Sequence, residues 1–371
     1  MALIIVRLIL YILNFKGFFV KLKIFINYIA FILLVVFITF AISNFIHNGS
    51  NYYETNLLKT IYNMKPNSID VLVIGPSTSE SGWNPLVAWN NYGITSLNYS
   101  FSLLPAPVIK NIIIDVLKKQ KPEVILINVD SFTNHVKKDK GRKFFFYYIY
   151  RFIPMSFNKL DILKKMTTFY NLDFKTFIYS ILPITAMHEK VFADDIKPTG
   201  LCLAYIRNHY FQQNNSSANI RLDLLKQHFQ DNILPSQDIG DLFEFISNLE
   251  IPVLFVDVPQ PLFFTKPFYT KGLIEEYNSF FKLLREKNID YINTNQYYTI
   301  RDLNFYYPDS FDGDHLNYSG AKKYTDYVSK ILVDRYHLED KRNDPNYSFW
   351  NDAAKQYIKD VKDNFDVDIS L

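Results

Sequence analysis

Three residues in this sequence could together activate a nucleophile. Ser77 follows a short apolar run, IDVLVIG at 69–75, which ends in Gly-Pro-Ser. Much later in the chain, Asp312 and His315 occur with two residues between them. A serine hydroxyl is a poor nucleophile until an imidazole accepts its proton, and a carboxylate on the other ring nitrogen holds that imidazole in the required tautomer. The pattern predicts a catalytic triad of Ser77, His315 and Asp312.

The expected elements around these residues favour the same chemistry. The β-branched run at 69–75 predicts a buried strand, and Ser77 would then lie at the carboxyl edge of a parallel sheet, where such sheets bind ligands. His315 directly precedes a segment with helical spacing of apolar residues, so one tight loop could deliver both the imidazole and the carboxylate. Gly-Pro-Ser alone is also an ordinary turn sequence, so the inference depends on the Asp-x-x-His segment.

The nucleophile segment resembles the first block of the SGNH (GDSL-type) hydrolase superfamily, in particular of its membrane-anchored bacterial branch. That block reads Gly-x-Ser with an Asn-Pro several residues on. In this chain the matching positions are Gly75, Ser77, Asn84 and Pro85.

The second segment resembles the last block of the same superfamily, which reads Asp-x-x-His-Leu followed by a glycine and a helix. Asp312, His315, Leu316 and Gly320 occupy these positions here. The two blocks occur in the family's order, nucleophile first, and they bracket residues 69–335. The resemblance implies that Ser77 is the nucleophile, His315 the general base and Asp312 the residue that orients it.

The middle blocks depart from the family pattern, which places an oxyanion-hole glycine in the second block and an asparagine in the third. The second block here, LNYSFS, has no glycine but contains Asn98, and the third, INVDSF, contains Asn128 and Asp130. We expect the N–H of Ser77 to be one oxyanion donor, with Asn98, Asn128 and Asp130 as further oxyanion or substrate-binding candidates. Loss of one donor typically costs ~3 kcal/mol, so the departure could indicate a slow or specialised enzyme.

Further apolar runs and helical patterns place these segments in an α/β fold. Strands are expected at 123–129, 251–258 and 289–294, and helices at 108–118 and 272–288. Strands that alternate with helices are typical of a parallel sheet covered by helices. The resemblance implies, more narrowly, a flavodoxin-like doubly wound parallel sheet of the SGNH type.

The expected α/β domain covers 67–337 and contains one large helical and aromatic insertion at 133–247. The aromatic stretch 143–157 within it could be a buried part of the insertion, a lid, a membrane-facing surface or a groove for a partner. Residues 47–66 are expected to be a polar connector, and 338–371 a polar C-terminal helix and tail.

An N-terminal apolar segment predicts a membrane anchor. Residues 24–46 include no charged residue and, as a helix, would cross ~30 Å of hydrocarbon. No A-x-A cleavage pattern follows, so we expect a retained transmembrane helix. The basic residues lie in 1–23, which predicts a cytoplasmic N-terminus and an extracytoplasmic domain. Residues 1–15 are also apolar but contain Arg7; we interpret them as an interfacial flank, and a second span is the alternative, which would reverse the domain's side.

Composition excludes several classes of protein. The net charge is +3, but four basic residues precede the first acidic one, and without them 36 basic residues face 37 acidic ones, a balance of −1. A near-neutral domain lacks the basic excess of a nucleic-acid binder. Cys202 is the single cysteine, so no intramolecular disulfide can form. No Walker loop, dinucleotide fingerprint or His-Glu-x-x-His motif occurs, and we expect neither a cofactor nor a metal.

The resemblance implies a membrane-anchored extracytoplasmic serine esterase or O-acyltransferase that acts on acyl esters of cell-surface glycans or teichoic-type polymers. Related anchored proteins are associated with O-acetylation of exported glycans or D-alanyl transfer to lipoteichoic acid. The implied partners are the acylated polymer and a membrane-bound O-acyltransferase. Two alternatives stay open: a catalytically impaired SGNH-like scaffold that binds a glycan or such a partner, and a sensor of unknown ligand, which should be indifferent to loss of the Ser77 hydroxyl.

Overall fold

A computed structural model of the 371-residue chain describes residues 17, 19–39, 41, 64–101, 104–132, 156–171, 236–260, 267–295, 315–365 and 368–371. Several predictions fall outside these residues. They are the triad carboxylate Asp312, the flank at 1–15, nearly all of the connector at 47–66, and the aromatic stretch 143–157 up to its last two residues.

Five parallel strands form the sheet at the centre of the domain. In chain order they are β1 (Val71–Ile74), β2 (Ser96–Asn98), β3 (Val124–Asn128), β4 (Val253–Val256) and β5 (Tyr291–Ile292). Their spatial order is β2-β1-β3-β4-β5, with every neighbouring pair parallel. This is the strand order of flavodoxin-like sheets. The predicted α/β class with a parallel sheet is confirmed.

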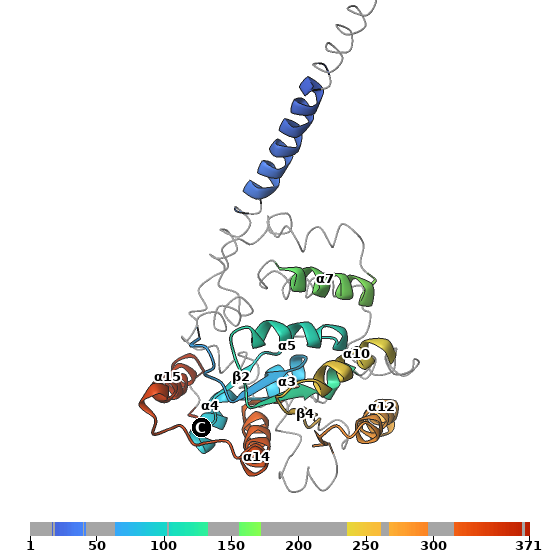
Figure 1. Cartoon of the computed structure of the whole chain (residues 1–371). Coiled ribbons are helices and arrows are strands. Elements are labelled where there is room, and N and C mark those ends of the chain that lie inside the picture. Colours follow the sequence, from blue (N-terminus) through green and yellow to red (C-terminus); the bar gives the residue numbers. More distant parts are fainter. Residues whose placement is uncertain are drawn as a thin grey trace, which may run out of the picture.

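Helices cover both faces of the sheet, which explains why its strands are apolar runs rather than alternating ones. In β1, Leu72 and Ile74 pack into one core, and Val71 and Val73 pack into the other, on the opposite face. Figure 1 shows the two layers of helices. The first layer contains α5 (Ile109–Leu117), α10 (Ser236–Ser247) and α12 (Pro267–Glu286), with α7 (Phe157–Phe169) packed on the outer side of α5. The second contains α4 (Pro85–Tyr92) and α14 (Tyr318–Tyr336).

Two of these helices lie within the insertion expected at 133–247. Helix α7 buries Ile162, Leu163 and Met166 in the same core as α5, and α10 adds Leu242 and Phe243 to it. The described parts of the insertion therefore add to the helices on this face of the sheet, α10 beside α5 and α7 on its outer side.

The chain enters the domain beside the amino ends of the strands. The backbone N–H of Asn67 donates to Lys119 O at 3.1 Å, and Ser68 N–H donates to Gln120 Oε1 at 2.9 Å. Parallel strands place all their carboxyl ends at the opposite edge, so the residues that follow β1, β3 and β4 converge there. That edge carries the candidate site.

The polar tail after 337 contributes a third, smaller core. Helix α15 (Ser348–Phe365) stacks Trp350 on Trp89 of α4, with ring centroids 5.6 Å apart, and Asn351 Oδ1 accepts a hydrogen bond of 3.0 Å from Trp89 Nε1. Trp350 is fully buried. The tail thus contains a helix, α15, which packs against the helix that follows the nucleophile segment.

A helix near the N-terminus, Phe19–Thr39, is long and apolar enough to cross a membrane. It has 21 residues, and none of its apolar window is buried against the rest of the protein. It begins five residues before the span predicted at 24–46 and so includes Lys21 and Lys23.

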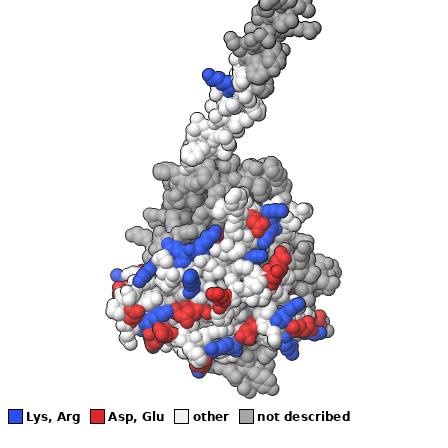
Figure 2. Space-filling view, in the orientation of Figure 1, with Lys and Arg blue, Asp and Glu red and all other residues white. Residues whose placement is uncertain are grey.

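In the domain, acidic and basic side chains both occur over the described face in Figure 2, in keeping with its near-neutral composition.

Substitution of Trp350 tests the contribution of the tail. Trp350→Ala should lower the free energy of unfolding by about 3–5 kcal/mol, because it removes a fully buried aromatic ring. The neighbouring Phe349 is 37% exposed, so Phe349→Ala should cost no more than about 1 kcal/mol. Urea unfolding of the full chain in detergent measures both. Equal losses would contradict the view that α15 is part of the core.

Candidate active site

Ser77 and His315 meet at the carboxyl edge of the sheet. The distance between Ser77 Oγ and His315 Nε2 is 2.8 Å, although 238 positions separate the two residues in the sequence. Both side chains are half-buried. In the tautomer that carries its proton on Nδ1, His315 accepts the hydrogen bond that the serine hydroxyl donates. Two of the three predicted triad residues are therefore brought together, and the third, Asp312, lies outside the described residues.

Two glycines allow the nucleophile helix to approach the sheet closely. Ser77 begins α3 (Ser77–Gly82). A Cβ on Gly75 would stand 2.6 Å from the Cβ of Asn128 and closer still to Ser79 Oγ, and a Cβ on Gly82 would stand 2.9 Å from Val258 Cγ2. Real Cβ atoms essentially never come this near. The glycines are required because α3 is packed directly on the residues at the ends of β3 and β4.

Asn98 secures the second half of α3. Its side-chain N–H groups donate to Ser79 O at 2.9 Å and to Trp83 O at 2.9 Å, so they satisfy carbonyls at the end of the helix. Asn98 is 8% exposed. The sequence suggested Asn98 as a second oxyanion donor; in the structure its amide nitrogen is engaged by the backbone of α3.

Asn128 and Asp130, the other two candidates, lie behind the nucleophile. Asn128 Nδ2 is 3.3 Å from Thr78 Oγ1, and its Oδ1 accepts a 2.7 Å hydrogen bond from Asp130 N. The Asp130 carboxylate accepts hydrogen bonds from Thr78 Oγ1, from the Tyr277 hydroxyl and, at 3.2 Å, from Gln260 Nε2. Asn128 and Asp130 are 0% and 1% exposed, so they face the protein interior. The backbone N–H of Ser77 remains the expected oxyanion donor.

A second buried acidic side chain, Asp257, follows β4 and forms hydrogen bonds with the residues that follow β5. It accepts hydrogen bonds from Thr294 Oγ1 at 2.7 Å and from Asn295 Nδ2 at 2.9 Å. Burial raises the pKa of Asp257, and the hydrogen bonds from Thr294 and Asn295 oppose that rise. Burial also raises the pKa of Tyr324 of α14, with further contributions from the negative charges of Asp257 and Asp130, so Tyr324 stays protonated.

The Asn-Pro pair of the first block starts a helix. Asn84 is the N-cap of α4, and its Oδ1 accepts hydrogen bonds from Leu86 N at 3.0 Å and Val87 N at 3.4 Å. Pro85 takes the first helical position, where a missing N–H costs nothing. The Asn84 backbone N–H donates to Thr325 Oγ1 at 2.9 Å, and Thr325 in turn donates to Gly82 O at 3.2 Å. This pair therefore fixes how α3, α4 and α14 join.

Sequence reasoning missed Thr78, Gln260 and Tyr277, which surround Asp130. Gln260 lies just past the strand predicted at 251–258, and Thr78 is next to the predicted nucleophile. Both positions are near the carboxyl edge of the sheet, and this could have marked them as candidates. Tyr277 lies inside a predicted helix and had no such signal.

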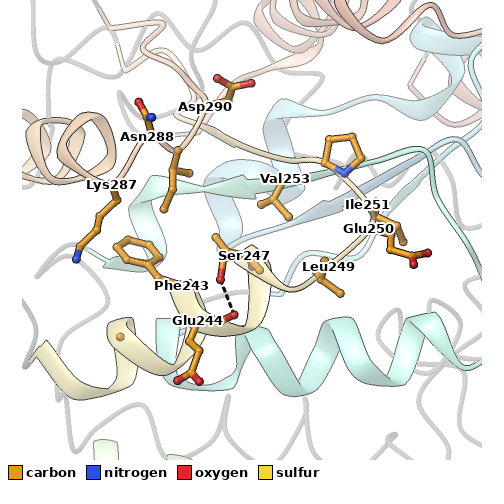
Figure 3. Close-up of a pocket in the computed structure, with 14 residues that line it drawn as sticks. Phe243, Glu244, Ser247, Leu249, Glu250, Ile251, Val253, Lys287, Asn288 and Asp290 are labelled. Carbon is orange, nitrogen blue, oxygen red and sulfur yellow. Dashed lines mark hydrogen bonds between the residues drawn. The ribbon is translucent and has the colours of Figure 1, made fainter.

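A pocket in the described part of the domain lies away from Ser77 and His315. It has a volume of about 790 Å³ and is formed by the end of α10, the approach to β4 and the turn after α12. Figure 3 shows Phe243, Val253 and Asn288 around it. These residues belong to the amino edge of the sheet, opposite Ser77.

Among the residues that the structure describes, no group of three or more His, Cys, Asp or Glu side chains could hold a metal ion.

No family model matches the chain, and no match was found among curated proteins or among solved structures. The resemblance to SGNH hydrolases is therefore carried by the two sequence segments, together with the contact between Ser77 and His315.

Substitution of Gly75 tests the close approach of α3 to the sheet. Gly75→Ala should lower the free energy of unfolding by about 1–3 kcal/mol, because the added methyl group must displace Ser79 or β3. Gly240→Ala is the matched control: nothing lies within 4 Å of its Cβ position, and it lies inside α10. That variant should gain up to about 1 kcal/mol from helix propensity. Urea unfolding compares the two, and a tolerated Gly75→Ala would argue against the tight contact.

Proposed function

We propose that the chain is a membrane-anchored serine esterase or O-acyltransferase of the SGNH type. The observation that carries the proposal is the 2.8 Å contact between Ser77 Oγ and His315 Nε2 at the carboxyl edge of a parallel sheet of order β2-β1-β3-β4-β5. A serine in hydrogen-bond contact with an imidazole is the arrangement that activates a hydroxyl for attack on an ester.

The proposed reaction has two halves. In the first, Ser77 Oγ attacks the ester carbonyl while His315 Nε2 accepts the hydroxyl proton; the C–O bond to the leaving alcohol then breaks, and His315 returns the proton to that alcohol. In the second, water or a sugar hydroxyl attacks the acyl-enzyme with the same proton transfers. Asp312 is the expected residue to orient His315, and the N–H of Ser77 is the expected donor to the oxyanion.

The proposed setting is the outer face of a cell membrane. The helix Phe19–Thr39 serves as the anchor, and the basic residues at its start, Lys21 and Lys23, favour a cytoplasmic N-terminus. The substrates are then acyl esters of cell-surface glycans or teichoic-type polymers. The resemblance adds a membrane-bound O-acyltransferase as the partner that supplies or receives the acyl group.

One observation supports a second candidate function, a catalytically impaired scaffold that binds a glycan or a membrane partner. The amide nitrogens of Asn98 and Asn128 bond to α3 inside the protein, and Asn128 is fully buried. An oxyanion hole with fewer donors catalyses more slowly. The retained contact between Ser77 and His315 favours the enzyme.

The nucleophile can be tested with the full chain in detergent, by fluorophosphonate labelling and by turnover of short acyl esters. Ser77→Ala should abolish labelling, and Ser77→Ala and His315→Ala should each lower turnover by at least about 10³-fold, because either change removes the activated hydroxyl. Ser79→Ala is the matched control, a serine of the same short helix that is 2% exposed and cannot reach substrate.

The result would exclude one of the two candidates. Labelling that survives Ser77→Ala, or equal losses in Ser77→Ala and Ser79→Ala, would contradict the assignment of the nucleophile. A folded wild-type protein that neither labels nor turns over any short acyl ester would support the scaffold instead.

The membrane topology can be tested by cysteine labelling in intact cells. In a Cys202→Ser background, Lys355→Cys, at an exposed position of α15, should react with a membrane-impermeant maleimide. Lys16→Cys, before the helix Phe19–Thr39, should react only after the membrane is opened. The reverse pattern would place the domain in the cytoplasm and contradict the proposed substrates.

A further inference from the structure

We infer that Asp130 is a positioning residue for the proposed reaction, and that it acts through Thr78 to hold Ser77 in line with His315. The inference rests on the proposed function, and it assigns to Asp130 a role other than contact with the substrate. Its basis is a set of hydrogen bonds that joins the nucleophile helix to the ends of the neighbouring strands.

Thr78 fixes the rotation of the first turn of α3. It is the residue after Ser77, and its hydroxyl donates to Asp130 Oδ2. Successive residues of an α-helix project about 100° apart, so a helix whose Thr78 points to the interior must turn Ser77 away from it. Ser77 then reaches His315. No side-chain hydrogen bond caps the N-terminus of α3, so its orientation needs another anchor.

Asp130 is itself held in place. Besides Thr78, its carboxylate accepts hydrogen bonds from the Tyr277 hydroxyl and from Gln260 Nε2, and Gln260 Nε2 lies 3.0 Å from the Tyr277 hydroxyl. Its backbone N–H donates to Asn128 Oδ1 at 2.7 Å. Side chains from three other elements or loops thus converge on one carboxyl group. Thr78 is therefore attached to a fixed acceptor.

The same network reaches the loops of two further strands. The Gln260 backbone N–H donates to Asn295 Oδ1 at 2.7 Å, and Asn295 Nδ2 donates to Asp257 Oδ2 at 2.9 Å. Asn295 follows β5, and Asp257 and Gln260 follow β4. Gln260 bonds to Asp130, which follows β3, and Asp130 bonds to Thr78, which follows β1. Hydrogen bonds therefore link the residues after four strands to the first turn of α3, which begins at Ser77.

Burial separates this role from direct catalysis. Thr78 is 3% exposed and Asp130 1% exposed, so neither is open to a substrate that approaches Ser77 from solvent. The second half of α3 is held separately, by Asn98 and by the contact of Gly82 with Val258. Loss of the bond from Thr78 to Asp130 should therefore loosen the Ser77 end of the helix while the rest stays in place.

The test is a kinetic series on the full chain in detergent. Thr78→Val keeps the shape of the side chain and removes the hydroxyl, and it should lower kcat and the rate of fluorophosphonate labelling by about 10- to 100-fold with KM within about threefold. Asp130→Asn should give a similar loss. The double variant should lose no more than the worse single one, since both changes break the same link.

Two controls separate positioning from general destabilisation. Thr78→Ser keeps the hydroxyl and should restore kcat to within about threefold of the wild type. Thr167→Val removes a threonine hydroxyl bonded to Leu163 O in α7, away from the site, and should leave kcat unchanged. If Thr78→Val does not fold, Tyr277→Phe carries the test: it removes one hydroxyl from Asp130 and should lower kcat about three- to tenfold.

The outcomes distinguish the two proposals. Wild-type labelling that depends on Ser77, together with full kcat in folded Thr78→Val or in Tyr277→Phe, would overturn the positioning role alone. A lower melting temperature with unchanged kcat per folded molecule would also overturn it. Absence of Ser77-dependent labelling in the wild type would overturn both.

Discussion

The close contact of α3 with the ends of β3 and β4 is the constraint on which the site depends. Gly75 and Gly82 lie at the two ends of this helix, and at each of them a methyl group would collide with a neighbouring strand or loop. Because the helix cannot shift outward without losing these contacts, the hydroxyl of its first residue has a defined position. His315 reaches that position from the residues just before α14, the helix that packs against α3.

Buried polar groups complement this packing. The interior at the carboxyl edge contains two acidic side chains, Asp130 and Asp257, whose burial is costly unless hydrogen bonds satisfy their oxygens. Thr78, Tyr277 and Gln260 supply them for Asp130, and Thr294 and Asn295 for Asp257. A network of this kind specifies one arrangement of the loops, because any slip leaves a buried polar group without a partner.

Much of the fold follows from local patterns, and much of the site does not. Runs such as 123–129 predicted β3 and the parallel sheet, since a strand buried on both faces must be apolar throughout. Strand β2 has three residues, Ser-Leu-Asn, too few to show a period. The pairing of Ser77 with His315 was predictable because it has a chemical reason. The contact of Tyr277 with Asp130 was not predictable, because it depends on how α12 packs against the sheet. The burial of Trp350 was not predictable either, because most of the residues around it in the sequence are polar.

The entry of the chain has a consequence for how the protein works at a surface. Hydrogen bonds hold Asn67 and Ser68 at the amino edge of the sheet, and Ser77 lies at the carboxyl edge. The point where the chain enters the domain and the Ser77 hydroxyl are therefore at opposite edges of the sheet. Residues 40–63 between the helix and Met64 would reach at most about 86 Å when fully extended. In the proposed arrangement, the anchor would limit how far the Ser77 hydroxyl lies from the bilayer, and the hydroxyl would face away from the point where the chain enters the domain. Acyl groups on polymer chains that extend away from the lipid would then be within its reach.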